Sequence, residues 1–76
     1  MANNHDLKTR PISIKGNITT LRVEHIYWVV IDQIAKGAGL TYNQIVAVLK
    51  AKQPKDCNSL ASWVRVYVTS ELHKRV

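Results

Sequence analysis

The chain has 76 residues, 46% of them hydrophobic, and its 11 Lys and Arg against 5 Asp and Glu give a formal net charge of +6. This length allows one small domain with a marginal core, for which dimerisation is a common remedy. The lack of a long apolar run excludes a transmembrane helix, the single cysteine excludes an internal disulfide, and the N-terminus lacks the layout of a secretory signal, so we expect a cytoplasmic protein.

Positive charge is concentrated at the start of the chain. Within the first 22 residues Asp6 is the one acidic residue and four are basic: Lys8, Arg10, Lys15 and Arg22. This balance favours a polyanion partner such as nucleic acid, although solvated surface charge is the alternative explanation. Residues 1–10 are polar and without periodicity, which predicts a flexible basic arm ahead of one domain over residues 11–76.

Two short alternating segments follow this arm. Ile12 to Lys15 and Thr19 to Val23 alternate apolar and polar residues, and Gly16-Asn17 between them offers a two-residue hairpin turn. In that register Ser13 faces Thr20, and one sheet face collects four apolar residues: Ile12, Ile14, Leu21 and Val23. The pattern leaves open whether Ile12 to Lys15 is a strand or an extended lead-in. If it is not a strand, the second segment has no strand to pair with inside the chain, and a second copy of the chain would supply one.

Apolar residues at spacings of three and four predict helices in the rest of the chain. The first covers Glu24 to Lys36, with Trp28 and Ile31 on its apolar stripe, and ends at Gly37 and Gly39. This apolar face is broader than a monomer of three short helices needs, which indicates a buried subunit contact.

Two further helices follow. Thr41 is a suitable N-cap for the second, whose inward stripe includes Ile45 and Leu49. Asn58 or Ser59 begins the third, which has a two-sided apolar stripe. The chain is therefore predicted to be mainly α, with a short β segment near its start.

The order of these elements resembles the ribbon-helix-helix family of dimeric DNA-binding regulators. Thr20 to Val23 matches the family's ribbon strand, and Gly39 to Asn43, with the sequence Gly-Leu-Thr-Tyr-Asn, matches the turn that opens its second helix. Leu60 to Val68 is similar to a bacterial branch with an added third helix. The similarity covers residues 12–72. The sequence departs from that branch at His25, where a proline commonly begins the first helix.

The resemblance implies an intertwined homodimer, in which one strand from each subunit forms an antiparallel β-ribbon that enters the major groove of double-stranded DNA. It implies base contacts from Thr20 and Arg22, since an arginine can donate twice to guanine O6 and N7. Ile18, where several relatives carry a polar residue, would make apolar contact. The residues expected in the shared dimer core are Leu21, Val23, Trp28, Ile31, Ile45 and Leu49.

The resemblance also implies that DNA phosphates dock at the start of the second helix, where the first N–H groups have no partner within the helix. The residues expected at phosphates are Thr41, Tyr42, Asn43, Lys15, Lys8 and Arg10. The alternative for the helix start is that Thr41 and Asn43 only cap and solvate it. The neighbouring ribbon pattern favours the phosphate role.

No catalytic group, metal site or cofactor is expected, because Cys57, His5, His25 and His73 lack the spacing of metal ligands and no oxyanion-type glycine loop accompanies them. We therefore expect a transcriptional regulator, a repressor, and no enzyme. The alternative is an antitoxin or other protein-interaction module on the same dimeric fold, with a toxin or an acidic protein as partner. The sequence leaves open whether the third helix completes each subunit's core, caps the dimer or joins dimers.

Overall fold

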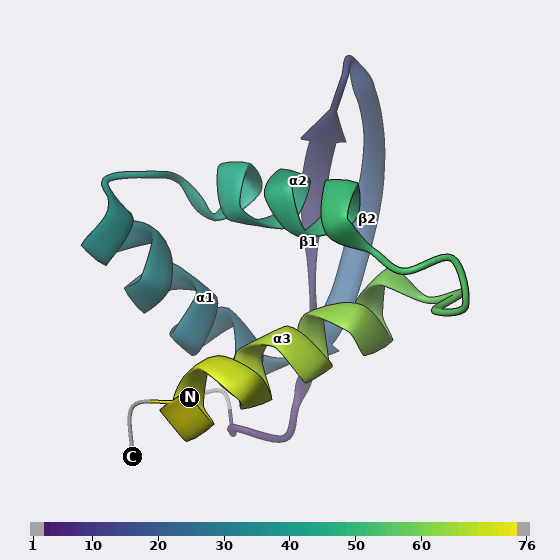
Figure 1. Cartoon of the computed structure of the whole chain (residues 1–76). Helices are drawn as coiled ribbons and strands as arrows, with labels where there is room; N and C mark the ends of the chain where they lie inside the picture. Colours follow the sequence, from purple (N-terminus) through teal and green to yellow (C-terminus); the bar gives the residue numbers. More distant parts are fainter. Residues whose placement is uncertain (1–2, 75–76) are drawn as a thin grey trace.

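Two strands and three helices make up most of residues 3–74, the part of the chain that the computed structural model describes (Figure 1). In chain order they are β1 (Leu7–Ile14), β2 (Asn17–Glu24), α1 (His25–Ala38), α2 (Tyr42–Lys52) and α3 (Leu60–Lys74). The expected fold, a ribbon strand followed by two helices and an added third helix, is confirmed. The segment before the ribbon is a strand, so the two form a hairpin.

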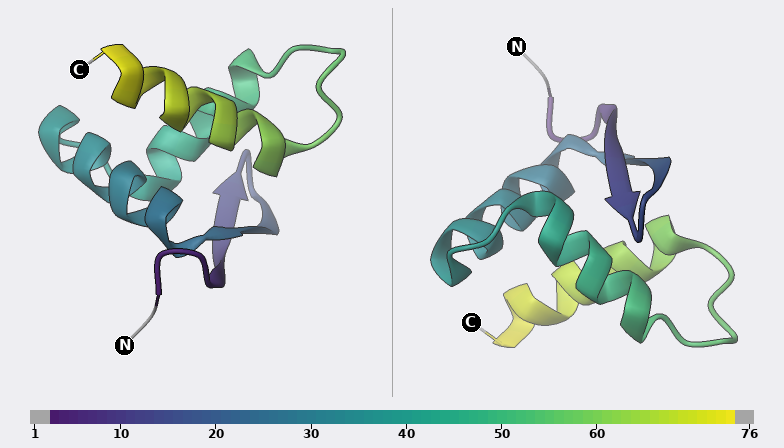
Figure 2. Two further views of the ribbon diagram at one scale, coloured as in Figure 1. Left: turned by 90° about the horizontal axis from the view of Figure 1, so that it is seen from below. Right: turned by 90° about the horizontal axis from the view of Figure 1, so that it is seen from above.

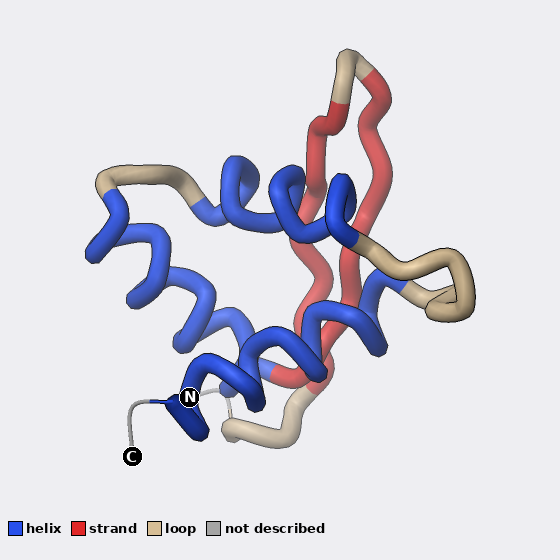
Figure 3. The backbone as a smooth tube through the Cα atoms, viewed as in Figure 1, coloured by secondary structure: helices blue, strands red, loops and turns tan. Residues whose placement is uncertain are grey.

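The three helices pack on one face of this hairpin. Both views in Figure 2 show them on the same side of it, and Ile12, Leu21 and Val23 on that face are at most 3% exposed. Figure 3 shows the tip of the hairpin, at Lys15 and Gly16, projecting beyond the helices. Side chains alternate along a strand, so one set in β2 enters the core and the other set stays in solvent.

The hairpin turn lies at Lys15 and Gly16, one residue earlier than expected. Both residues have positive φ, 52° and 82°, as a two-residue type I′ turn requires. Ser13 consequently lies opposite Ile18 and not opposite Thr20. The pairing is displaced by two residues, an even number, so the predicted division of side chains between the two faces is unchanged.

Pro11 explains this register. In the expected pairing Pro11 would lie opposite Arg22 at a position where the two residues exchange backbone hydrogen bonds, and proline has no N–H to donate. In the observed pairing Pro11 lies opposite Thr20, and the hydrogen-bonded positions pass to its neighbours Arg10 and Ile12. The strands thereby pair along their full length without a lost bond at the proline.

The hydrophobic core forms within one chain. The third helix contributes Val64 and Val68, which are 0% and 1% exposed, so α3 completes the subunit core. The broad apolar face of α1 is covered by α2, by α3 and by the hairpin. The six residues expected in the dimer core are all buried within one chain: Leu21, Val23, Trp28, Ile31, Ile45 and Leu49.

Most of the arm expected over residues 1–10 belongs to the fold. β1 begins at Leu7, so the last part of the expected arm pairs with β2. Ahead of the strand, the carbonyls of Asn4 and Asp6 accept hydrogen bonds from the first turn of α1. Residues 1 and 2 lie outside the described residues.

These two carbonyls fix where α1 begins. The N–H of His25 donates to Asp6 at 2.7 Å, and the N–H of Ile26 donates to Asn4 at 3.1 Å. Glu24, the N-cap, makes no side-chain capping bond. The preceding chain thus satisfies N–H groups that a helix leaves unpaired in its first turn, and the start needs no proline.

An ion pair joins α3 to the junction between β2 and α1. Arg65 Nε lies 2.8 Å from Glu24 Oε1, and the guanidinium lies 6.0 Å from the centre of the Tyr27 ring. On the same helix, Trp63 Nε1 donates to the Leu49 carbonyl of α2 at 2.8 Å. The hydrogen bond from Arg65, with a backbone hydrogen bond at Glu24, holds the pKa of the Glu24 carboxyl below its usual value.

Replacing Val64 by alanine tests the contribution of α3 to the core. Because this side chain is fully buried, its truncation should lower the free energy of unfolding by about 2 kcal/mol through lost burial and a residual cavity. Val66, which is 54% exposed, provides the control, and Val66→Ala should change it by less than about 0.5 kcal/mol. Urea denaturation measures both. Equal losses in the two variants would show that α3 does not pack as described.

The Glu24–Arg65 pair should make stability depend on pH in the acid range. The pKa of Glu24 is lower in the folded than in the unfolded chain, so its contribution is complete above the unfolded value, near 4.5, and is lost as the pH falls through the folded value. Thermal unfolding of the wild type and Glu24→Gln, from neutral to acid pH, measures this contribution. The difference in Tm should shrink below about pH 4.5, and a difference that stays constant would contradict the role of the pair.

Candidate nucleic-acid interface

The hairpin face turned away from the helices carries the residues expected to contact bases. Ile18, Thr20 and Arg22 are exposed and alternate along β2 with the buried Leu21 and Val23. Ile18 is 79% exposed, the largest value among the exposed large hydrophobic residues of the described chain. Arg22 has no ion-pair partner within residues 3–74. A free guanidinium, a hydroxyl and an apolar side chain therefore stand in line on one surface.

The same three residues form an open strand edge. In an antiparallel pair, alternate residues direct both backbone groups to the same neighbour. Ser13, opposite Ile18, has both of its groups bound outside the hairpin. Ile18, and with it Thr20 and Arg22, must therefore direct N–H and C=O away from β1. These groups make no hydrogen bond to another element within residues 3–74.

The opposite edge, on β1, is closed by α2 from Pro11 to Ser13. The Tyr42 hydroxyl donates to the Pro11 carbonyl at 2.9 Å. The Asn43 side chain makes two bonds to Ser13: the Ser13 N–H donates to Oδ1 at 2.7 Å, and Asn43 Nδ2 donates to the Ser13 carbonyl at 2.8 Å. Pro11 has no N–H to satisfy. The β1 edge is therefore satisfied from Pro11 to Ser13, whereas the β2 edge is open from Ile18 to Arg22.

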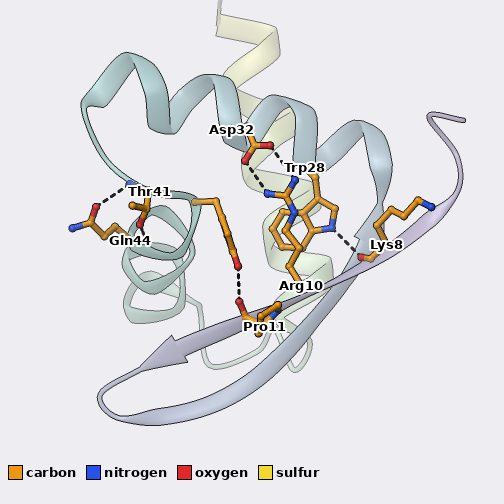
Figure 4. Close-up of polar contacts among 8 residues, drawn as sticks. Lys8, Arg10, Pro11, Trp28, Asp32, Thr41 and Gln44 are labelled. Carbon is orange, nitrogen blue, oxygen red and sulfur yellow. Dashed lines mark hydrogen bonds and ion pairs between the residues drawn. The ribbon is translucent and has the colours of Figure 1, made fainter. Parts of the chain in front are cut away.

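Arg10 lies on the helix side of the sheet, within the subunit. Its guanidinium makes two hydrogen bonds to the Asp32 carboxylate, at 2.9 and 3.0 Å (Figure 4). It also lies 4.7 and 4.9 Å from the ring centres of Trp28 and Tyr42. The bonds to Asp32 raise the pKa of Arg10, so Arg10 keeps its positive charge. Trp28 Nε1 donates to the Lys8 carbonyl at 2.9 Å. These contacts join β1 to α1 and give Arg10 a structural role.

The two lysines expected at phosphates are exposed but lie apart. Lys15 occupies the tip of the hairpin, and Lys8, opposite Val23, is near its other end. The geometry does not bring them together with Arg22 into one cluster.

The start of α2 keeps two N–H groups available. Thr41 Oγ1 accepts from the Gln44 N–H at 3.2 Å, and Gln44 Oε1 accepts from the Thr41 N–H at 2.8 Å, which is a capping box (Figure 4). Neither bond uses the backbone N–H of Tyr42 or Asn43, and these make no hydrogen bond within residues 3–74. An anion can dock there, as at other helix N-termini.

The bonds from α2 to β1 are not expected from the sequence. Asn43 contacts a residue thirty positions earlier, whereas the Gly-x-Thr-x-Asn pattern only indicates the start of a helix. Pro11 carries one usable signal, because proline within a sheet marks an edge strand. No local spacing predicts which side chains cover that edge.

Other kinds of site have little support within the described chain. Residues 3–74 contain no group of three or more His, Cys, Asp or Glu side chains placed to hold a metal ion. The half-buried Cys57 is a free thiol. Among the described helices, none has the length and apolar character needed to cross a bilayer.

A family model described as a ribbon-helix-helix domain matches residues 7–72. Among solved structures, the chain is similar to an uncharacterized protein from Bordetella pertussis Tohama I, with a TM-score of 0.70 and 20% identity over 96% of this chain and 64% of that one. This chain thus spans less than two thirds of that protein, and the likeness shows the fold alone. No curated protein matches. Because the family model covers the hairpin and nearly all of the three helices, the chain belongs to the ribbon-helix-helix domain family.

Proposed function

We propose that this protein is a cytoplasmic, dimeric transcriptional regulator that binds double-stranded DNA sequence-specifically through its β2 strands. One observation carries the proposal: Ile18, Thr20 and Arg22 provide both the open strand edge and the exposed side-chain face. Membership of the ribbon-helix-helix family and the net charge of +6 support it. Occupation of its site by the dimer would by itself block transcription, so the proposed action is repression.

The backbone of β2 restricts how two copies can pair. Only residues with outward N–H and C=O groups can exchange hydrogen bonds, so Ile18, Thr20 and Arg22 must pair with the same set in the second copy. The alignment that uses all three places Thr20 opposite its own equivalent on the two-fold axis, and Arg22 opposite the equivalent of Ile18. The resulting four-stranded sheet has helices on one face and a continuous exposed surface on the other.

This geometry suits the major groove. The groove is about 12 Å wide and admits a two-stranded ribbon, so the two central β2 strands would enter it and the outer β1 strands would face the phosphate walls. The two Arg22 side chains would start about 14 Å apart, because four residues along a strand span about 13 Å and neighbouring strands are about 4.8 Å apart. At about 3.4 Å per base pair, the operator should hold two guanines on opposite strands, about four base pairs apart.

Phosphate contacts would position the dimer without reading sequence. The free N–H groups of Tyr42 and Asn43 are the proposed anchor, with Thr41 fixing the helix start. Lys15 is exposed at the hairpin tip and available for a further contact, whereas Lys8, although exposed, stands on the helix side of the sheet, opposite Val23. Arg10 is excluded from this set, because its guanidinium is bound to Asp32.

Arg22→Ala should reduce discrimination between bases. Loss of a two-donor contact to guanine should cost about 1–3 kcal/mol of preference for the operator over the same duplex with that guanine replaced. Lys36→Ala is the control, since it removes one exposed positive charge from the last turn of α1, remote from the ribbon. Fluorescence anisotropy at fixed salt, with a duplex selected from a random library, measures both. Failure to bind any duplex at low salt, or an unchanged preference in Arg22→Ala, would contradict the proposal.

Thr20→Pro should prevent dimerisation without disrupting the hairpin. Thr20 lies opposite Pro11 with its N–H directed outward, so proline removes a donor from the open edge and none from the bonds between β1 and β2. Thr9→Pro removes an outward N–H from the other edge and serves as the control. Sedimentation equilibrium should give a monomer for Thr20→Pro and a dimer for Thr9→Pro. If both variants keep the wild-type mass, the subunits do not pair through β2.

A further inference from the structure

We propose that the Asn43 side chain acts as a substitute strand, which blocks the β1 edge against a second copy of the chain and stops assembly at the dimer. The proposal rests on the proposed function only in taking the dimer as the wild-type assembly. It concerns the edge of the hairpin that is not used for pairing.

The Asn43 amide offers the same donor and acceptor as a peptide group. It accepts from the Ser13 N–H at 2.7 Å and donates to the Ser13 carbonyl at 2.8 Å, both within the usual range for such bonds. Two opposed bonds to one residue are what a neighbouring antiparallel strand makes at a hydrogen-bonded position. The side chain therefore occupies the place that a residue of an incoming strand would take.

The neighbouring position on the edge is closed as well. The outward carbonyl of Pro11 accepts from the Tyr42 hydroxyl, and Pro11 has no N–H. From Pro11 to Ser13 every outward backbone group is thus satisfied by α2 or missing. An incoming strand would have to displace both α2 side chains before it gained any hydrogen bond there.

This closure matters because a hairpin has two edges. When two copies pair through β2, the four-stranded sheet ends in a β1 strand on each side. If those edges were open, each dimer could add another through β1, and the alternating contacts would continue without closing. Asn43 is present once at each outer edge, so in the dimer both outer edges are covered at Ser13.

Asn43→Ala tests the proposal directly. Alanine favours helix, so α2 should persist while the β1 edge loses its cover. Gln44→Ala is the matched control, because it removes a polar contact from the same helical turn, the capping bond to Thr41, and leaves Ser13 covered. In sedimentation equilibrium over a wide concentration range, the wild type and Gln44→Ala should reach a constant mass, whereas the mass of Asn43→Ala should keep rising. Equal masses for all three folded proteins would overturn the proposal.

A second variant shows that any added assembly uses the β1 edge. Ser13→Pro in the Asn43→Ala background removes the donor that Asn43 had covered, so neither position 11 nor position 13 can donate to an added strand. This double variant should return to the wild-type mass. Continued growth would place the new contact elsewhere and overturn the proposal.

Amide hydrogen exchange in the wild type covers the case in which Asn43→Ala does not fold. The Ser13 N–H should be protected at every protein concentration, because its partner lies in the same chain. The Thr20 N–H should gain protection only as the dimer forms. Rapid exchange at Ser13 overturns the Asn43 proposal, whereas rapid exchange at Thr20 at all concentrations overturns the proposed dimer, so the two failures are distinguishable.

Discussion

A two-stranded hairpin presents two rows of unpaired backbone groups, and the fate of those rows decides what this fold can do. From Pro11 to Ser13, the row on β1 is satisfied within the chain by Tyr42 and Asn43 at the start of α2. The row on β2 is left open. The open row belongs to the residues whose side chains face solvent, Ile18, Thr20 and Arg22, so pairing of two chains would join their exposed side-chain faces into one surface.

The subunit core does not depend on that pairing. Trp28 and Ile31 of α1 are buried within a single chain, among the hairpin, α2 and α3. A ribbon of one strand would leave β2 without a strand to pair with inside the chain. Here β1 pairs with β2, and α3 adds its buried side chains to the core. The buried residues of the core are therefore separate from the exposed residues of the β2 edge, and substitutions at that edge leave the core side chains unchanged.

Local patterns in the sequence predict much of the fold. Alternation along Thr19 to Val23 places Leu21 and Val23 in the core and Thr20 and Arg22 in solvent, as the structure has them. Thr41 begins α2 as expected, because a side-chain cap is a local interaction. The sequence does not predict the first half of β1, because Lys8 and Arg10 stand at inward positions and break the apolar alternation that marks a strand.

The remaining differences come from interactions that sequence spacing does not encode. The turn moves by one residue because Pro11 must avoid a hydrogen-bonded position, a constraint that is readable from the sequence once both strands are known. The bonds of Asn43 to Ser13 and of Arg10 to Asp32 join residues 30 and 22 positions apart. Only the packed structure shows that these polar groups close an edge and anchor a strand.

The central claim is that two copies pair through β2 around Thr20. Isotope-filtered NOE spectroscopy on a mixture of labelled and unlabelled protein reports contacts between copies alone. It should show antiparallel cross-strand contacts between β2 strands, with Thr20 near its own equivalent and Ile18 near Arg22. Contacts between copies that involve β1, or none that involve β2, would contradict it.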